Sequence, residues 1–389
     1  MVAAAIADWA AATPLIDGVL FGSSDGEVAG PPVCAVAVAG NFRGYGKGLT
    51  HSQALASAVG EALELFSASR IDPRRLVQAP FAELGAAAFD PAWLCLYSEE
   101  QYGRRGFPFQ PFDPHRPLHW IEGCWLDNNQ PVYLPAFAIA LSDQFAGEAL
   151  CQVTSNGLAA GESHPAAVEH AVLELYERDA FLLSWLALLP KRKVAAHSIP
   201  PDSASLISHL ASRGARTEVY LLAQDQAAVV AVAVAIGDGI EWPAFTLGLG
   251  AARNRSRAIG KALLELGQTG PFLARVWRRR ESPLPIAPQD IKTLQDHALY
   301  YCTSSHRGEF ARWRATPNGL PTAAFTDVRI AAVDLTPPEL QISPFRVVRA
   351  LARGLQTVSC GYGFQRLPCA RLAALLAGNP PNPSPCPIC

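Results

Sequence analysis

The sequence predicts a globular fold that combines helices with β-sheets and contains three related strand–loop–helix units. Each unit ends in a helix that carries an acidic residue and, three residues later, a second acid or an amide. Residues three apart share one face of a helix. Apolar residues surround each pair, so we expect the three faces to line a common crevice. The pairs are Glu61 with Glu64, Glu174 with Glu177, and Glu265 with Gln268.

The composition is that of a well-buried globular protein. The chain has 389 residues, of which 50% are hydrophobic and 17% are charged, and its formal net charge is -2. This length accommodates one large domain or two to three ordinary ones. The near-zero charge gives no reason to expect a nucleic-acid partner or a binding surface for anionic membranes.

The cysteines and the first residues indicate a reducing compartment. The 9 cysteines are scattered and form no dense disulfide framework. Residues 1–21 contain Asp8 and Asp17 and lack a basic start, so they do not form a signal peptide. The longest apolar run, 227–236, is too short to span a bilayer. We therefore expect a cytoplasmic protein without a membrane partner.

The first unit begins with a buried strand at 33–40 and continues through a glycine-rich loop at 41–49. Thr50 begins the helix, with Gln53 completing a capping box. The loop can present backbone N–H groups and Lys47 to a phosphate group, although an ordinary turn is the alternative. Its glycine spacing is not that of a Walker A motif.

The second unit is predicted as a strand at 151–155, a turn at 156–161 and a helix that starts over 163–165, where proline is well tolerated. The third unit is a strand at 244–248, a turn near 250–254 and a helix from about Ser256.

Other segments connect or surround the units. Residues 219–222 and 228–236 are predicted strands of a mixed sheet. The proline-rich segment 281–288 is a surface connector. The basic run of Arg275 and 278–280 is interpreted as a solvated face, with phosphate or peptide contact as the minor alternative.

The acid pairs suggest a chemistry. Carboxylates gathered in one crevice repel each other unless cations lie between them. Oxygen ligands of this kind suit Mg²⁺, which usually arrives with the phosphates of a substrate. A single pair would more often be a solvated helix face, but three copies in matching contexts favour a site. A recurring structural unit without chemistry is the alternative.

The last residues, 378–389, are unusual. Prolines at Pro383, Pro385 and Pro387 cannot join a helix, so this tail is expected to be extended. Cys386 and Cys389 form a CxxC pair, but a zinc site normally needs four ligands and no second pair exists. Terminal disorder is the other alternative.

Four segments together resemble the YcaO family: residues 46–69, 155–180, 262–268 and 346–367. The last of them is similar to the late segment of the azoline-forming members. The resemblance implies an α+β fold with mixed sheets and helices that converge on a nucleotide. It also implies a single YcaO-type domain over 1–389, whose tail at 378–389 enters the active site.

The resemblance implies that the protein binds ATP and Mg²⁺. Glu61, Glu64, Glu174 and Glu177 match the metal-site acids of the family. Glu162 stands where the family often has asparagine, and Ala166 stands where some members carry an acid. Lys261 replaces a frequent arginine and loses its planar fork. With Lys47 from the glycine segment, the implied nucleotide-binding residues are Lys47, Asn156, Glu162, Arg178, Lys261, Glu265 and Gln268.

The activity implied by the resemblance is ATP-dependent cyclodehydration of a ribosomally made precursor peptide, which converts Cys, Ser or Thr residues into thiazolines or oxazolines. The tail prolines resemble the Pro-x-Pro-x-Pro end of these enzymes, and the terminal carboxylate of Cys389 is the candidate base. Ile388 and Cys389 extend beyond the last proline, which departs from the family pattern. Two alternatives remain, namely thioamide formation on a peptide and a non-catalytic scaffold that holds the peptide.

The partners also follow from the resemblance. The chain lacks room for a fused leader-binding domain, so a separate partner similar to a ubiquitin-activating enzyme is expected. A flavin dehydrogenase that oxidises the rings is a further possible partner. A homodimer and a hetero-complex are the expected assemblies.

Overall fold

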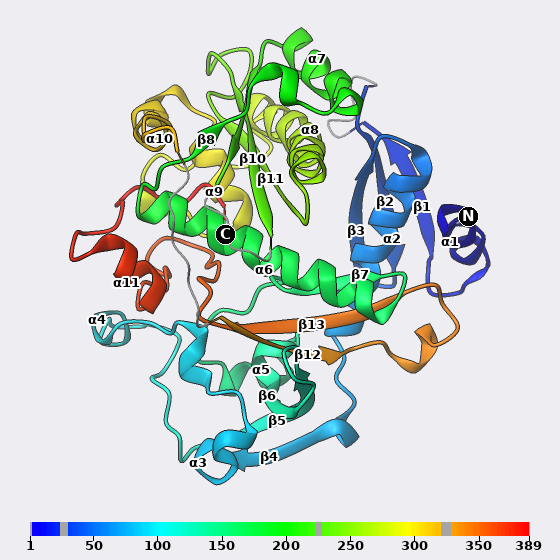
Figure 1. Ribbon diagram of the computed structural model, residues 1–389, viewed down its shortest axis with the longest axis vertical. Helices are drawn as coiled ribbons and strands as arrows, with labels where there is room; N and C mark the ends of the chain where they lie inside the picture. The colour runs from blue at the N-terminus through cyan, green and yellow to red at the C-terminus, as the bar shows by residue number, and fades with distance from the viewer. Residues whose placement is uncertain (1, 24–29, 223–227, 320–327, 389) are drawn as a thin grey trace.

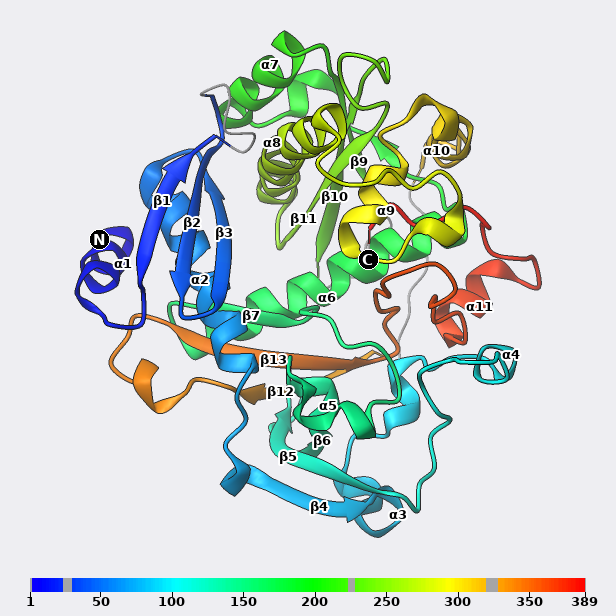
Figure 2. The same cartoon turned by 180° about the vertical axis from the view of Figure 1, so that it is seen from behind.

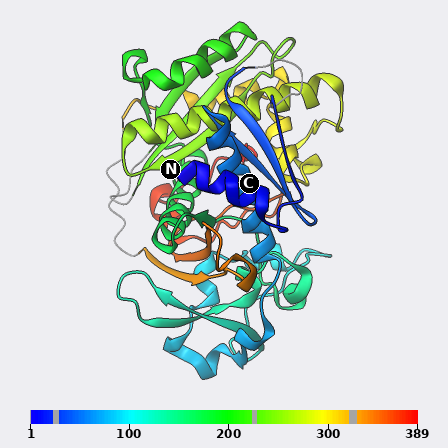
Figure 3. The same ribbon diagram turned by 90° about the vertical axis from the view of Figure 1, so that its right-hand side faces the viewer.

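The computed structural model of the chain describes residues 2–23, 30–222, 228–319 and 328–388. Three sheets and the helices that pack on them make up this part of the chain, which confirms the predicted α+β class (Figure 1). Seen from the side of the N-terminal helix, the second sheet and its helix lie above the third sheet (Figure 3). Every strand ladder in the described residues is antiparallel.

The first sheet has the strand order β1-β2-β3. Helix α2 covers one face of this sheet, and the N-terminal helix α1 packs on α2. The cap of α2 is the predicted one, because the Thr50 side chain accepts the N–H of Gln53. The bounds are β1 Gly18–Gly22, β2 Val33–Ala39, β3 Phe42–Gly48, α1 Val2–Ala12 and α2 His51–Ala68.

The glycine-rich segment is a strand, so the prediction of a loop at 41–49 was wrong. Its glycines alternate along β3 and face α2. A Cβ atom at Gly44, Gly46 or Gly48 would lie under 3.0 Å from atoms of α2. The glycines therefore let the helix approach the strand closely, and the side chains between them, Tyr45 and Lys47, point to the opposite face of the sheet.

The second sheet has the order β11-β10-β9-β8 and carries helix α8. The strands predicted at 219–222 and 228–236 are present, but they pair antiparallel instead of forming a mixed sheet. The third unit's strand runs further than predicted, through Ala252, because Gly248 and Gly250 again allow close contact with the helix. The bounds are β8 Arg192–Lys193, β9 Arg216–Leu221, β10 Val229–Ile236, β11 Thr246–Ala252, α7 Ala204–Ser212 and α8 Arg255–Arg279.

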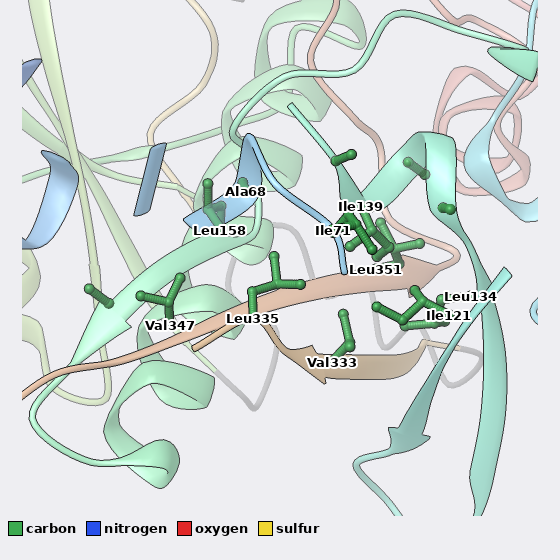
Figure 4. Close-up of a cluster of buried hydrophobic side chains, with 14 of the residues drawn as sticks. Ala68, Ile71, Ile121, Leu134, Ile139, Leu158, Val333, Leu335, Val347 and Leu351 are labelled. Atoms are coloured by element: carbon green, nitrogen blue, oxygen red, sulfur yellow. The ribbon is translucent and has the colours of Figure 1, made fainter. Parts of the chain in front are cut away.

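The third sheet has the order β4-β5-β12-β13-β7, with β6 paired to β5, and helix α6 crosses it. Its buried side chains include Ile121, Leu134, Val333 and Leu351 (Figure 4). The bounds are β4 Leu76–Pro80, β5 Pro117–Trp125, β6 Pro131–Pro135, β7 Leu158–Gly161, β12 Arg329–Asp334, β13 Arg346–Arg353 and α6 His164–Leu186.

The second unit differs from its prediction. Residues 151–155 form no strand, and the strand β7 lies inside the predicted turn at 156–161. Gly157 has a φ of +82°, which turns the chain so that the next residues pair with β13. The start of α6 is as predicted, because the Ser163 side chain accepts the N–H of Ala166.

The remaining helices are short, and all four residues of one of them, α5, are buried in the core. The segment 281–288 contains no α-helix or strand, and Ile286 is 82% exposed there, as predicted for a surface connector. None of the described helices combines the length and the apolar character that a membrane-spanning segment needs. The bounds are α3 Phe81–Leu84, α4 Glu99–Tyr102, α5 Ala136–Ile139, α9 Leu294–Tyr300, α10 Arg307–Arg314 and α11 Ala370–Leu376.

The close approach of β3 to α2 can be tested with Gly46→Ala. The added methyl group would collide with the backbone of Ala54 and Ala58, so we expect the free energy of unfolding to fall by about 1–3 kcal/mol. The matched control is Gly22→Ala on β1, where a Cβ meets nothing within 4 Å. Urea denaturation of both variants gives the comparison. An equal effect of the two substitutions would contradict the packing role of Gly46.

Candidate active site

The first acid of each unit is held in the same way. Its carboxylate accepts a backbone N–H group from the segment that precedes its own helix, 16 or 17 residues earlier. This shared hydrogen bond orients the three carboxylates relative to their strands. It supports the interpretation of the three segments as related structural units. The bonds join Tyr45 N to Glu61 Oε2 (2.9 Å), Gly157 N to Glu174 Oε2 (3.1 Å) and Leu249 N to Glu265 Oε1 (3.3 Å).

The structure brings the acids of the three helices together. Glu64 on α2 accepts the N–H of Ala160 on β7 at 2.6 Å, which joins the first unit to the second. The charges of Glu61 and Glu174 both act on Glu64, and the charges of Glu265 and Glu174 act on Glu177. The predicted convergence of α2, α6 and α8 is thus present (Figure 2).

Burial determines the protonation of these acids. Desolvation raises the pKa of Glu61 and Glu174, and it raises the pKa of Glu64 well above its usual value. The pKa of Glu177 rises to about 7, because burial outweighs the favourable charge of Arg178. A cation among these side chains would favour their ionised forms.

Basic side chains lie among the acids. Arg178 approaches Glu177 at 3.6 Å and Glu174 at 4.0 Å, and Lys47 lies 3.6 Å from Glu265. Burial lowers the pKa of Lys261, although the charge of Glu177 opposes this shift. The cluster therefore combines both signs of charge in a partly desolvated space.

A polar cavity of about 570 Å³ opens between β3 and α8. Three basic side chains, Lys47, Arg257 and Lys261, line it together with the carboxylates of Glu177 and Glu265. Basic groups beside carboxylates suit a polyphosphate that carries a divalent cation.

A second cavity of about 490 Å³ lies on the other side of the Lys47–Glu265 ion pair, since both residues line both cavities. Its charged and amide side chains are Lys47, Glu61, Arg178, Glu265, Gln268 and Gln295. The rest of its wall is largely apolar and includes Phe245, Leu247, Phe272, Leu273, Leu294, Tyr301, Pro387 and Ile388.

The proline-rich tail enters this second cavity. Pro385 and Pro387 are buried, whereas Pro383 is exposed. Tyr301 donates to the carbonyl oxygen of Pro385 at 2.6 Å, and Trp185 donates to that of Ser384 at 3.1 Å. The tail thus has fixed partners on α6 and directly after α9, and its residues Pro387 and Ile388 line the cavity. Cys389 itself lies outside the described residues.

His297 fixes the tail in a further way. Its Nδ1 lies 2.7 Å from the carbonyl oxygen of Cys386, and its Nε2 accepts the N–H of Gly361 at 2.9 Å. These two contacts require the neutral ring with its proton on Nδ1. Burial lowers the pKa of His297, which favours this neutral form.

Some predicted site residues line neither cavity. Glu162 is exposed in the turn before α6. Asn156 is buried in a small cavity of about 40 Å³ that Arg349 and Arg366 also line. Glu64 and Glu174 are not among the lining residues of the two large cavities either. Gln268 lines the second cavity and donates weakly to the carbonyl oxygens of Tyr45 and Gly46.

Sequence reasoning did not single out several residues near the acids. Arg257 lines the polar cavity one helical turn before Lys261, and that spacing on α8 was the available signal. Arg349 is fully buried, and its pKa falls to about 10 because desolvation outweighs the charge of Glu174. A basic residue in an apolar strand was its only signal. Tyr301 and His297 carried no signal, because their role depends on the position of the tail.

Within the described ranges, no three His, Cys, Asp or Glu side chains are placed to hold a metal ion by themselves. The CxxC pair of Cys386 and Cys389, for which no zinc site was expected, includes a residue outside the described chain, and Cys386 is buried with the tail.

Residues 45–356 match the YcaO cyclodehydratase family, which is described as ATP- and Mg²⁺-binding. The match covers most of the sequence, so the chain belongs to the YcaO family. The family assignment made from the sequence motifs is therefore confirmed, and so is the predicted cofactor pair of ATP and Mg²⁺.

One curated relative is an uncharacterised protein of Methanothermobacter thermautotrophicus, which is 28% identical over 228 residues. The alignment covers 58% of this chain and 56% of the relative. The chain thus spans about half the length of this curated relative.

Two solved structures share the fold. A heterocyclase in complex with substrate and cofactor is 19% identical, with a TM-score of 0.76, and the match covers 100% of this chain and 57% of that one. YcaO from Methanopyrus kandleri, bound with AMPPCP and Mg²⁺, is 21% identical, with a TM-score of 0.61 and coverage of 88% and 86%. At these identities the likeness concerns the fold.

The raised pKa of Glu177 predicts how stability depends on pH. Between about pH 4.5 and 7 the folded protein keeps a proton that the unfolded chain releases. The free energy of unfolding of the ligand-free protein should therefore fall by about 2–3 kcal/mol as the pH rises through this window. Glu177→Gln should make this decrease smaller, because only Glu61, Glu64 and Glu174 then keep a raised pKa, whereas Glu83→Gln, at an exposed position, should retain the full decrease. Urea titrations at several pH values provide the measurement; a decrease in Glu177→Gln as large as that of the wild type would contradict the assignment.

The hydrogen bonds to the tail predict a change in thiol reactivity. Tyr301→Phe removes the donor to Pro385, so the tail should detach more often and Cys386 should be alkylated about tenfold faster. Tyr300→Phe is the matched control, because the Tyr300 hydroxyl donates to Glu309 and not to the tail. Peptide-level mass spectrometry gives the rates. Equal rates in the two variants would show that this bond does not retain the tail.

Proposed function

We propose that the protein catalyses ATP-dependent cyclodehydration of Cys, Ser or Thr residues in a ribosomally made peptide. The observation that carries the proposal is the meeting of two unlike cavities at the Lys47–Glu265 ion pair. One cavity is polar and basic, and the other is largely apolar and holds the proline-rich tail. A reaction between a nucleotide phosphate and a peptide amide requires two such compartments side by side.

The polar cavity is the proposed nucleotide site. Lys47, Arg257 and Lys261 would neutralise the phosphate oxygens, and Glu177 and Glu265 would hold the magnesium ion. Glu61 lies on the other side of the ion pair, and Glu64 and Glu174 do not line the polar cavity. We propose that these three acids adjust the charge of the site and orient the side chains next to them. Glu162 has no proposed role because of its exposure.

The apolar cavity is the proposed peptide site. The substrate thiol or hydroxyl would add to the preceding amide carbon there, losing its proton to a base. ATP would supply the phosphoryl group that turns the amide oxygen into a leaving group, with Mg²⁺ neutralising its charge. Loss of phosphate together with the amide proton gives the ring, so each ring removes one water from the peptide.

The tail would supply the base. Pro387 and Ile388 line the apolar cavity, and we propose that the Cys389 carboxylate accepts protons there. Pro383, exposed outside the cavity, would only fix the direction of the tail. The contacts of Trp185, Tyr301 and His297 support this role, because they hold the tail in place, and Tyr301 also lines the cavity.

A second protein is part of the proposal. The heterocyclase that shares the fold is a longer chain, of which this one covers 57%. We propose that a separate leader-binding protein delivers the precursor peptide to this chain.

Co-expression with a leader-binding protein and a candidate precursor peptide tests the proposal, and the intact mass of the peptide is the measurement. The wild type should remove one water per ring. Glu177→Gln should abolish this loss, while Glu83→Gln should keep it. Deletion of 383–389 should also abolish it and still leave the affinity for a fluorescent ATP analogue within about twofold, because the polar cavity does not include the tail.

The mass also separates the alternatives. An increase in the mass of the peptide that corresponds to the exchange of oxygen for sulfur would indicate thioamide formation instead of cyclodehydration. An unmodified peptide with no ATP consumption would favour the non-catalytic scaffold. Full activity of the truncated chain would remove the tail from the mechanism.

A further inference from the structure

Helix α2 covers the inner face of the first sheet, whereas the outer face of this sheet borders a cavity. Helix α2 packs on the face that carries Ala35, Ala37 and Ala39 of β2, which are all buried. Side chains alternate along a strand, so Val36 and, on β3, Tyr45 point to the other face. Both line a cavity of about 580 Å³ on that side.

An apolar row crosses this outer face. Leu20 pairs with Val36, and Val36 pairs with Tyr45, so the three side chains stand side by side on adjacent strands. Leu20 is 73% exposed and Tyr45 is 50% exposed. Large apolar side chains gathered on an exposed face often mark a binding surface.

Helix α8 forms the opposite wall of this cavity. We refer to the cavity together with the row of Leu20, Val36 and Tyr45 as the groove. The contribution of α8 includes Phe272 and Arg275, and β2 contributes Cys34 and Val36. The guanidinium group of Arg275 stacks on Phe272 at 5.3 Å and pairs with Glu281 at 3.4 Å. The sheet and α8 lie next to each other in both front and rear views (Figures 1 and 2).

The groove is continuous with the active site. Four residues line both this groove and the tail-containing cavity, namely Tyr45, Gln268, Thr269 and Phe272. The row therefore begins at the edge strand β1 and ends at Tyr45, whose backbone N–H holds the carboxylate of Glu61. A chain that lies along this row would reach the acids directly.

We propose that this groove binds the segment of the substrate peptide next to the reacting residue and selects apolar side chains in that segment. The proposal rests on the proposed function, because it requires a peptide substrate. Three adjacent strands span about 10 Å, which corresponds to about three residues of an extended peptide. The three basic side chains suited to phosphates line the polar cavity and not the groove. The nucleotide is therefore assigned to the polar cavity and the peptide to the groove.

The test uses two sets of fluorescein-labelled 12-residue peptides with one central cysteine. One set has Val, Leu or Phe beside the cysteine, and the other has Asp, Lys or Ser. Fluorescence anisotropy is measured on the full chain saturated with AMPPCP and Mg²⁺. The apolar set should bind at least tenfold more tightly than the polar set.

Two variants connect this preference to the groove. Leu20→Glu and Val36→Glu should each weaken binding of the apolar set about tenfold or more, and Leu20→Glu is safe for folding because of its exposure. Ile342→Glu is the matched control, since Ile342 is 92% exposed and does not line the groove. None of the three should change binding of the fluorescent ATP analogue.

The outcomes separate the two proposals. Equal affinity for the two sets, no binding by either set, or no effect of Leu20→Glu and Val36→Glu would overturn the groove while nucleotide binding stays intact. The proposed function is tested separately, because it predicts that Glu177→Gln loses nucleotide binding. If sedimentation shows a dimer that either groove variant converts to monomer, a second copy covers this face and the peptide assignment fails.

Discussion

The interaction on which the site depends is the hydrogen bond from a backbone N–H to a buried carboxylate, made once in each unit. Glu61, Glu174 and Glu265 each receive such a bond from the segment before their own helix. Burial raises the pKa of Glu61 and Glu174, and one backbone donor offsets only part of that shift. A cation would offset the rest of the desolvation cost, so the cluster is suited to a metal–phosphate ligand. Arg178, Lys47 and Lys261 supply some of that charge in the protein itself.

The close contact between strand and helix makes this geometry possible. Alternate glycines on β3 and on β11 bring α2 and α8 against the strands, closer than any side chain would permit. The acids are then within hydrogen-bonding distance of the strand backbone, and Tyr45 and Lys47 are turned to the opposite face. One sequence feature thus fixes the position of the acid, the exposure of the lysine and the wall of the groove.

The acids and the helix starts could be predicted from the sequence, because their signals are local. Thr50 and Ser163 cap their helices as expected, and the acid pairs at helical spacing lie on the three helices that converge. The glycine segment was assigned as a loop because glycine is common in turns, and only tertiary packing shows that β3 needs it. The same limit explains the second unit, where β7 forms through pairing with β13, almost 200 residues away in the chain. Tyr301 and His297 had no local signal because their partners are carbonyl groups of the tail.

The ion pair of Lys47 and Glu265 is a wall shared by two compartments, and this has a consequence for the order of events. At 3.6 Å the pair is weak enough for a phosphate group to draw the ammonium group away. Glu265, which lines both compartments and is proposed to hold the magnesium ion, would then lose its ammonium partner beside Gln268 and Ile388. Filling one compartment would thereby change the charge of the other, so the two substrates would influence each other's affinity without any movement of the backbone.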